Sequence, residues 1–360
     1  EYKVMGLAPY GEPKYKDLIF KHLIDVKDDG SFRMDMSYFD YNVGLTMTNK
    51  KFNDLFGGPP RRPESELTQK EMDLARSVQE VTEEIVIKMA KHVRYITKQK
   101  YLCLAGGVAL NCVANGKLLR SKIFDDIFIQ PAAGDAGGAL GCAYIAWYQH
   151  LSNKRVADGK NDFMSGAYLG PAFSNDQIKK YLDDKKYKYE KLSDEELPEK
   201  IADLINEQSV IGWFQGRMEF GPRALGGRTI IGDSRSAETQ RTINLKIKYR
   251  ESFRPFAPSI RSENISDYFE IDRESPYMLL VANIQKEKQI QMTEKQSSFF
   301  GLEKLNVARS EVPAVTHVDY SARIQSVNEK TNSRYHQLLT KFYDKYGCPL
   351  IVNTSFNVRG

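Results

Sequence analysis

One stretch of the sequence, residues 210–260, concentrates side chains that could bind phosphate. It opens with an apolar run at 210–214 that is typical of a strand, and a turn at Gly216 follows. Arginine offers a planar fork that fits two phosphate oxygens, and glycine lets backbone N–H groups approach an anion closely. We therefore expect an anion pocket here, with a solvated basic face as the alternative. The candidate residues are Arg217, Glu219, Arg223, Arg228, Lys248, Arg250 and Arg254.

A second candidate anion site lies at Gly106 and Gly107, between an apolar run at 101–105 and a helical pattern at 109–119. We expect a buried strand, a tight turn and a helix. The first N–H groups of a helix have no partner within it, so this junction could face a nucleotide. A turn that serves packing alone is the alternative.

The same order of elements follows directly, with a strand at 127–129, a loop at 130–135 and a small-residue helix at 136–148. Asp135 falls where the loop meets the helix. Its carboxylate could cap the helix or hold a divalent metal, and spacing alone favours the cap. Two successive strand–helix units predict an α/β domain whose site lies at the strand ends.

Periodicity is lost over residues 149–168, so we expect a first domain at 1–155, a linker at 156–168 and a second domain at 169–360. In the first, residues 69–98 have apolar spacings of three and four, and Thr68 with Glu71 predicts a capping box. The second should contain helices at 174–183, 194–207 and 329–346 and strands at 315–320 and 350–352.

Composition narrows the class of protein. The chain has 360 residues, 41% hydrophobic residues and a formal net charge of +5, which suits a globular protein and gives only weak support for nucleic-acid binding. Four cysteines lack CxxC spacing and sit in apolar runs, so we expect buried free thiols. Neither a signal peptide nor a membrane-spanning run is evident, and the cytoplasm is the expected location.

Five motifs together resemble one family. GRMEFGPRALGGR, KYRESFRPFAPS, LAGGVALN, PAAGDAGGALG and NTSFN occur in order and cover nearly the whole chain. They are similar to motifs of the O-carbamoyltransferases of the nodulation-protein-U, cephalosporin and tobramycin type. Both ends of the sequence fall inside motifs, so we expect the family's sequence to continue beyond each end.

The resemblance implies an α/β protein of two coupled parts. The first is the second lobe of an actin-like ATPase (ASKHA) domain. It is followed by a domain similar to the threonylcarbamoyl-adenylate synthases (YrdC-like). The YrdC-like domain is expected to form carbamoyl-adenylate from carbamoyl phosphate and ATP. The actin-like domain is expected to transfer the carbamoyl group to a hydroxyl of a small-molecule acceptor such as a sugar or antibiotic, with a bound metal. Iron is expected, and Mg²⁺ could accompany the ATP.

The resemblance also assigns roles to single residues. Lys248, Arg250, Ser355 and Asn357 match the family's Lys-x-Arg and Ser-x-Asn signatures and are expected to be catalytic. The arginine-rich loop matches Arg217, Glu219, Arg223 and Arg228, with Arg254 nearby. The turn that faces the nucleotide matches Gly106, Gly107 and Asn111. Asp135 matches a metal ligand, which reverses the preference for the cap.

The remaining metal ligands of the family, a His-x-x-x-His pair, are not found in this sequence and are expected upstream of it. Two other functions stay open. One is a tRNA threonylcarbamoyladenosine-type modification enzyme, which would need a basic groove. The other is a non-catalytic nucleotide-binding module. Exchange of pyrophosphate that depends on carbamoyl phosphate would distinguish an enzyme from a module.

Overall fold

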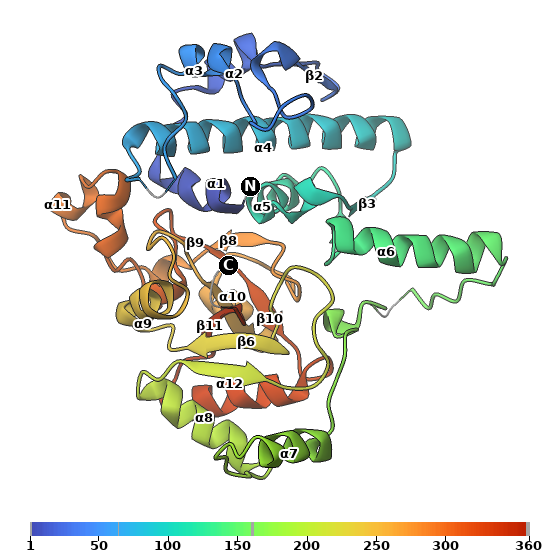
Figure 1. Ribbon diagram of the computed structural model, residues 1–360, viewed down its shortest axis with the longest axis vertical. Coiled ribbons are helices and arrows are strands. Elements are labelled where there is room, and N and C mark those ends of the chain that lie inside the picture. Colours follow the sequence, from blue (N-terminus) through green and yellow to red (C-terminus); the bar gives the residue numbers. More distant parts are fainter. Residues whose placement is uncertain (1, 64, 160–161, 358–360) are drawn as a thin grey trace. The chain divides into compact units, whose positions relative to one another are not determined.

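A computed structural model describes residues 2–63, 65–159 and 162–357 (Figure 1). Helices and strands are interspersed along the chain, and five of the strands form a mixed sheet, which confirms the expected α/β class. The chain divides into two compact units. Unit 1 comprises Glu1–Leu102, Lys117–Ile127 and Glu294–Asn306, and unit 2 comprises Cys103–Gly116, Phe128–Thr293 and Val307–Gly360.

These units do not follow the expected boundary at 156–168. Residues 103–116 and 128–155 belong to unit 2, together with most of the chain from 169 onward. Among the described strands, no sheet joins strands from the two sides of Ser165. The functional domains 1–155 and 169–360 stay a prediction.

Unit 1 is built along the helix α4 (Gln69–Thr97), which confirms the helix expected at 69–98. Its capping box is present, and the Thr68 amide donates to Glu71 Oε2 over 2.8 Å. Val81 and Ile85 are buried on the α4 face that packs with α2 and its neighbours. The other elements of this unit are α1 (Tyr2–Leu7), α2 (Lys16–His22), β1 (Ile24–Val26), β2 (Phe32–Met34), α3 (Lys50–Leu55) and α11 (Glu294–Ser297).

Unit 2 is organised around a five-stranded sheet of order β10-β7-β11-β6-β5. β10 and β7 are parallel, and the other neighbours are antiparallel. The central strand β11 pairs Ser355 with Thr229 at one end and Leu350 with Ile260 at the other. The strands are β5 (Ile211–Phe214), β6 (Arg228–Gly232), β7 (Ala257–Arg261), β10 (Gln325–Val327) and β11 (Leu350–Ser355).

The helices α8 and α12 lie along this sheet (Figure 1). α12 buries Leu338, Leu339 and Phe342 in the core beside the apolar residues of β11. The helix expected at 329–346 begins only at Ser333, because the Asn332 side chain accepts from the Tyr335 amide and caps it there. Unit 2 also contains the helices α7 (Asn175–Asp184), α8 (Glu196–Asn206), α9 (Ala237–Thr242), α10 (Ile265–Tyr268) and α12 (Ser333–Tyr346) and the small strands β8 (Val281–Asn283) and β9 (Ser321–Arg323).

The two strand–helix units are present, as β3 (Tyr101–Leu104) with α5 (Cys112–Arg120) and β4 (Asp126–Ile129) with α6 (Asp135–Tyr144). The prediction that β3 is buried was wrong, since Tyr101 and Cys103 are exposed. Among the strands of the described residues, β3 pairs with β4 alone, and its side chains alternate between the two faces of this two-stranded sheet.

Two further expectations need correction. Of the four cysteines only Cys112 and Cys348 are buried, because Cys103 and Cys142 lie on exposed positions of β3 and α6. The strand expected at 315–320 begins instead at Ser321, after a turn in which Asp319 accepts from the Ser321 amide. None of the helices in the described ranges has the length and apolar character needed to cross a membrane.

Candidate functional site

Lys248 lies at the end of a wide helical turn. The segment Ile243–Ile247 has π-helical geometry, and the Lys248 amide donates to the Ile243 carbonyl over 2.9 Å. Such turns are frequent at functional sites. Tyr249, the next residue, has a φ of 46°, a left-handed conformation that costs free energy for a residue with a side chain. The backbone is therefore held in an unfavourable form beside the Lys248 amine.

The Lys248 side chain reaches the end of β11. Its Nζ donates to the carbonyl and the hydroxyl of Ser355 and to Asn357 Oδ1, the last over 2.7 Å. The Ser355 hydroxyl also donates to Asn357 Oδ1 over 2.9 Å. Lys248 is fully buried, whereas Asn357 is exposed. An amine, a hydroxyl and an amide from segments more than a hundred residues apart thus meet at one point, called here the Lys248 cluster.

The electrostatics of this cluster favour an anion. Burial, together with the charges of the nearby Arg250 and Arg254 guanidinium groups, lowers the pKa of Lys248 to about 8. Positive groups that depress one another's charge are stabilised when an anion binds among them. The cluster can therefore hold phosphate or carboxylate oxygens.

Sequence reasoning missed Asn244, which organises the loop between Lys248 and Arg254. Asn244 is fully buried, and its Oδ1 accepts from Arg250 Nε over 2.8 Å. Its Nδ2 donates to the carbonyls of Ser252 and Arg254. No local pattern marks this asparagine, because it lies within a helical segment where an amide side chain is usually exposed.

Glu219 accepts hydrogen bonds from backbone amides of the glycine-rich loop at 221–227 and so holds its conformation. The carboxylate is buried, and its Oε1 accepts from the amides of Leu225 and Gly227 over 2.7 Å each. Gly226 has a φ of 104°, and a Cβ there would lie 2.4 Å from the Tyr335 ring. The loop conformation therefore depends on this glycine and this carboxylate.

Arg228 and Arg217 bind backbone oxygens of the same region. The Arg228 guanidinium donates to the carbonyls of Gln215 and Gly227 over 2.8 Å each and stacks on the Phe214 ring at 3.5 Å. Arg217 donates to the Leu169 carbonyl over 2.8 Å. The described hydrogen bonds of both arginines are made to backbone carbonyls and not to members of the Lys248 cluster. Arg228 is nevertheless the first residue of β6, the strand that pairs with the Ser355 end of β11.

Arg223 forms a different pair, with Arg323, which sequence reasoning also missed. Repulsion from Arg323, together with burial, lowers the pKa of Arg223 to about 10. Arg223 donates to the Leu110 carbonyl over 3.3 Å, and the buried Nε atoms of both arginines have no hydrogen-bond partner among the described residues. Two neighbouring guanidiniums with unused donors are suited to an anion. Arg323 lies a hundred residues away, so spacing could not reveal the pair.

The Gly-Gly turn leads into a 3-10 turn at Gly107–Leu110, and α5 begins at Cys112, three residues later than the helix expected at 109–119. Gly106 has a φ of 94°, and its amide donates to the Ala133 carbonyl over 2.8 Å. A Cβ on Gly107 would meet no atom within 4 Å, so the turn borders open space. Asn111 Oδ1 accepts from the Ala114 amide over 3.1 Å and so caps α5. This bond gives Asn111 a structural role besides the nucleotide contact that the resemblance implies.

Asp135 is exposed and is the first residue of α6. It was expected in the preceding loop, but the helix begins one residue earlier than predicted and Gly134 takes the capping position. The described residues contain no group of three or more His, Cys, Asp or Glu side chains that could hold a metal ion. Asp135 could supply one ligand, but the described residues do not by themselves complete a metal site.

Family comparisons match most of the chain. The carbamoyltransferase N-terminus family matches residues 1–144, and the carbamoyltransferase C-terminus family matches residues 202–360. The boundary expected at 156–168 falls between these two matches.

Several proteins of other organisms have similar sequences. An uncharacterized protein of Synechocystis sp. is 59% identical over all of this chain and 59% of its own length. Nodulation protein NolO of Bradyrhizobium diazoefficiens is 38% identical over 99% of this chain and 59% of its own length. The 3'-hydroxymethylcephem-O-carbamoyltransferase of Streptomyces clavuligerus is 31% identical over 72% of this chain and 43% of its own length. The chain thus spans about half the length of these relatives, and it belongs to the carbamoyltransferase family.

Proposed function

We propose that this chain supplies the carbamoyl-activating part of an ATP-dependent O-carbamoyltransferase. In this reaction water releases phosphate from carbamoyl phosphate and leaves carbamate. A carbamate oxygen attacks the α-phosphorus of ATP, pyrophosphate leaves, and carbamoyl-adenylate forms. The hydroxyl of a small-molecule acceptor then attacks the carbamoyl carbon, loses its proton and displaces AMP. The observation that carries the proposal is the meeting of Lys248, Ser355 and Asn357 beside two arginines.

The Lys248 cluster suits the first half of this reaction. Carbamate and the ATP phosphates are all anions, so bringing them together requires positive charge in a site with little water. Lys248 is buried, and Arg250 and Arg254 add charge near it. The Ser355 hydroxyl and the Asn357 amide can bind the oxygen and nitrogen edges of a small planar carbamate.

Several finer assignments are part of the proposal. The region of 169–360 has the YrdC-like role of adenylate formation, and 1–155 is one lobe of an actin-like (ASKHA) transfer domain. The acceptor is a small molecule, which the relative named as a cephem O-carbamoyltransferase supports. Cytoplasmic location follows from the need for ATP. A metal bound through Asp135 would polarise the carbamoyl group or the acceptor hydroxyl during transfer.

The proposal is tested by isotope exchange. With ATP, Mg²⁺ and carbamoyl phosphate present, the purified protein should transfer labelled pyrophosphate into ATP, and it should not do so when carbamoyl phosphate is omitted. Because adenylate formation is reversible, this exchange needs no acceptor. Exchange that is absent in both conditions would refute the adenylation step.

Affinity for ATP should depend on pH through Lys248. Its pKa of about 8 means that the amine is mostly charged at pH 7 and mostly neutral at pH 9, so an anion loses its partner as pH rises. We expect the Kd for ATP to increase roughly tenfold between pH 7 and pH 9, measured by calorimetry. The Lys248→Gln variant should bind weakly with a nearly flat profile. An equal rise in Kd in this variant would assign the titration to another group.

Residues 1–360 alone should not retain iron. Asp135 is the single predicted ligand among the described residues, and one carboxylate does not hold a transition metal tightly. After purification, elemental analysis should give far less than one iron per chain, and Asp135→Ala should not change this value. Stoichiometric iron that disappears in Asp135→Ala would show that the chain itself completes the site.

A further inference from the structure

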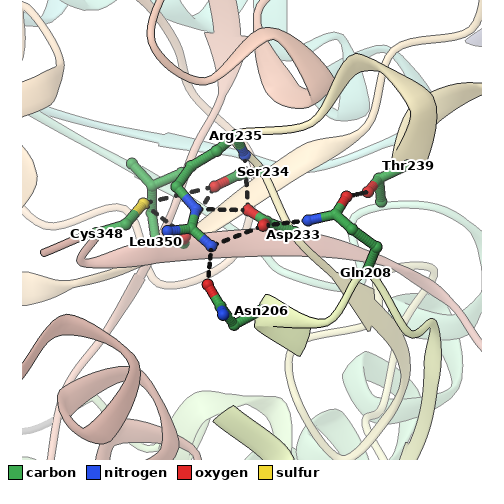
Figure 2. Close-up of polar contacts among 8 residues, drawn as sticks. All are labelled: Asn206, Gln208, Asp233, Ser234, Arg235, Thr239, Cys348 and Leu350. Atoms are coloured by element: carbon green, nitrogen blue, oxygen red, sulfur yellow. Dashed lines mark hydrogen bonds and ion pairs between the residues drawn. The ribbon is translucent and has the colours of Figure 1, made fainter. Parts of the chain in front are cut away.

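Unit 2 contains a cavity of about 650 Å³ away from the Lys248 cluster. Its walls come from the end of α8, the segment before β5, the end of β6 and the helix α9. Figure 2 shows five of the lining residues, Asn206, Gln208, Asp233, Arg235 and Thr239, with their polar contacts. The volume is in the range of small-molecule sites.

The cavity and the Lys248 cluster lie at opposite ends of β11. Lys248 contacts Ser355 at the last position of the strand. Ser234, next to the cavity residues Asp233 and Arg235, donates to the Leu350 carbonyl at the first position. Five residue steps along a strand correspond to roughly 17 Å, so one small ligand cannot fill both places.

One wall of the cavity is held rigidly and is electrically balanced. Asp233 Oδ2 accepts from Arg235 over 2.8 Å and from Gln208 over 2.7 Å, and Arg235 also donates to Asn206 Oδ1 over 2.8 Å (Figure 2). Asp233 is buried, and its charge is paired with that of Arg235. Glu238 also lines the cavity, and its exposed carboxylate lies 4.0 Å from Arg241. Because each carboxylate has a cationic partner, the cavity carries little net charge and offers little attraction to a charged ligand.

The other side of the cavity presents hydroxyl groups that the fold does not use. Ser236 and Thr242 line the cavity, and neither hydroxyl has a hydrogen bond in the part of the chain that the structure describes. The Asn206 amide nitrogen likewise has no described acceptor, because only Oδ1 is used. Asp233, Arg235 and Gln208 bind one another and so have a structural role. The Ser236 and Thr242 hydroxyls and the Asn206 amide nitrogen have no such role and are available to a ligand.

We propose that this cavity is a second small-molecule site, for a neutral, hydroxyl-rich ligand such as a mono- or disaccharide. Hydroxyl and amide groups can each donate to and accept from sugar hydroxyls. The balanced wall disfavours charged ligands, and its internal hydrogen bonds fix the site before binding. The inference does not depend on carbamoyl transfer.

The test measures binding of D-glucose and maltose to the protein by calorimetry, without ATP or carbamoyl phosphate. At least one should bind saturably, and D-gluconate and D-glucosamine should bind at least tenfold more weakly. The double variant Ser236→Ala/Thr242→Val removes both unused hydroxyls and should lower the affinity by about tenfold or more, as expected for two lost hydrogen bonds.

The matched control is Ser262→Ala/Thr340→Val. These hydroxyls are buried and likewise have no described hydrogen-bond partner, but they do not line the cavity, whereas Ser236 and Thr242 are half-buried at it. The control should bind sugar like the parent protein, and thermal unfolding should show that both variants fold. The proposal is overturned if neither sugar binds, if the charged analogues bind as well, or if both double variants have the same affinity.

Discussion

Replacement of Lys248 by alanine should reduce carbamoyl-phosphate-dependent exchange of pyrophosphate into ATP by about 100-fold or more, the size expected for loss of a preorganised charge at a transition state. The amine is the buried centre of the cluster, with Ser355 and Asn357 as its partners.

The variant should keep its fold, which makes the loss interpretable. Removal of the amine relieves repulsion from Arg250 and Arg254, and the Ser355 hydroxyl still has Asn357 Oδ1 as a partner. Lys248→Met, which nearly preserves volume, should be as inactive as the alanine variant.

Lys246 provides the matched control. It lies two residues earlier on the same helical segment and is exposed. Lys246→Ala removes the same charge from the same segment and should retain exchange within about twofold of the parent. Full exchange activity in Lys248→Ala, or an equal loss in Lys246→Ala, would show that the cluster does not bind the reacting anions.

The sequence predicted elements with long periodic patterns well. The helix α4 and its capping box were found within one residue of their ends, because apolar spacing and the Thr68–Glu71 pair are both local signals. Burial was predicted less well. Cys103 lies in an apolar run, but the run forms one strand of a two-stranded sheet and is open to solvent.

The sequence indicated which residues to consider for the candidate site, but it did not indicate the hydrogen-bond and charge partners of each residue. Sequence motifs selected Lys248, Ser355 and Asn357, and the structure brings these three together. The partners of Arg223 and Arg250, namely Arg323 and Asn244, depend on strand register and on a π-helical turn, which no local pattern encodes. The phosphate-binding roles assigned to the arginine-rich loop stay predictions.

Glu219 was expected at the anion site, and its geometry leads to a different expectation. Glu219→Ala should lower the free energy of unfolding of unit 2 by about 3–5 kcal/mol, because buried amide donors are left without an acceptor. The donors are the amides of Leu225, Gly227 and Arg228. Glu219→Gln should lose about half as much, since its carbonyl oxygen can still accept from some of them.

Trp213 makes this change measurable in the right part of the chain. Its indole is buried in the unit 2 core and donates to the Gly226 carbonyl over 3.0 Å, within the loop that Glu219 braces. The sequence has two tryptophans, so a Trp147→Phe background leaves Trp213 as the sole tryptophan. Urea unfolding followed by its fluorescence then gives the difference in free energy.

The control Glu329→Gln removes an exposed carboxylate from the same unit and should change the free energy of unfolding by less than about 0.5 kcal/mol. The two possible roles of Glu219, which are to hold the loop and to contact the ligand, predict different effects on stability. If Glu219 only holds the loop, Glu219→Gln lowers stability and weakens ATP binding in parallel. If Glu219→Gln and Glu219→Ala unfold at the same urea concentration as the parent but bind ATP less well, the carboxylate acts on the ligand and the loop does not depend on it.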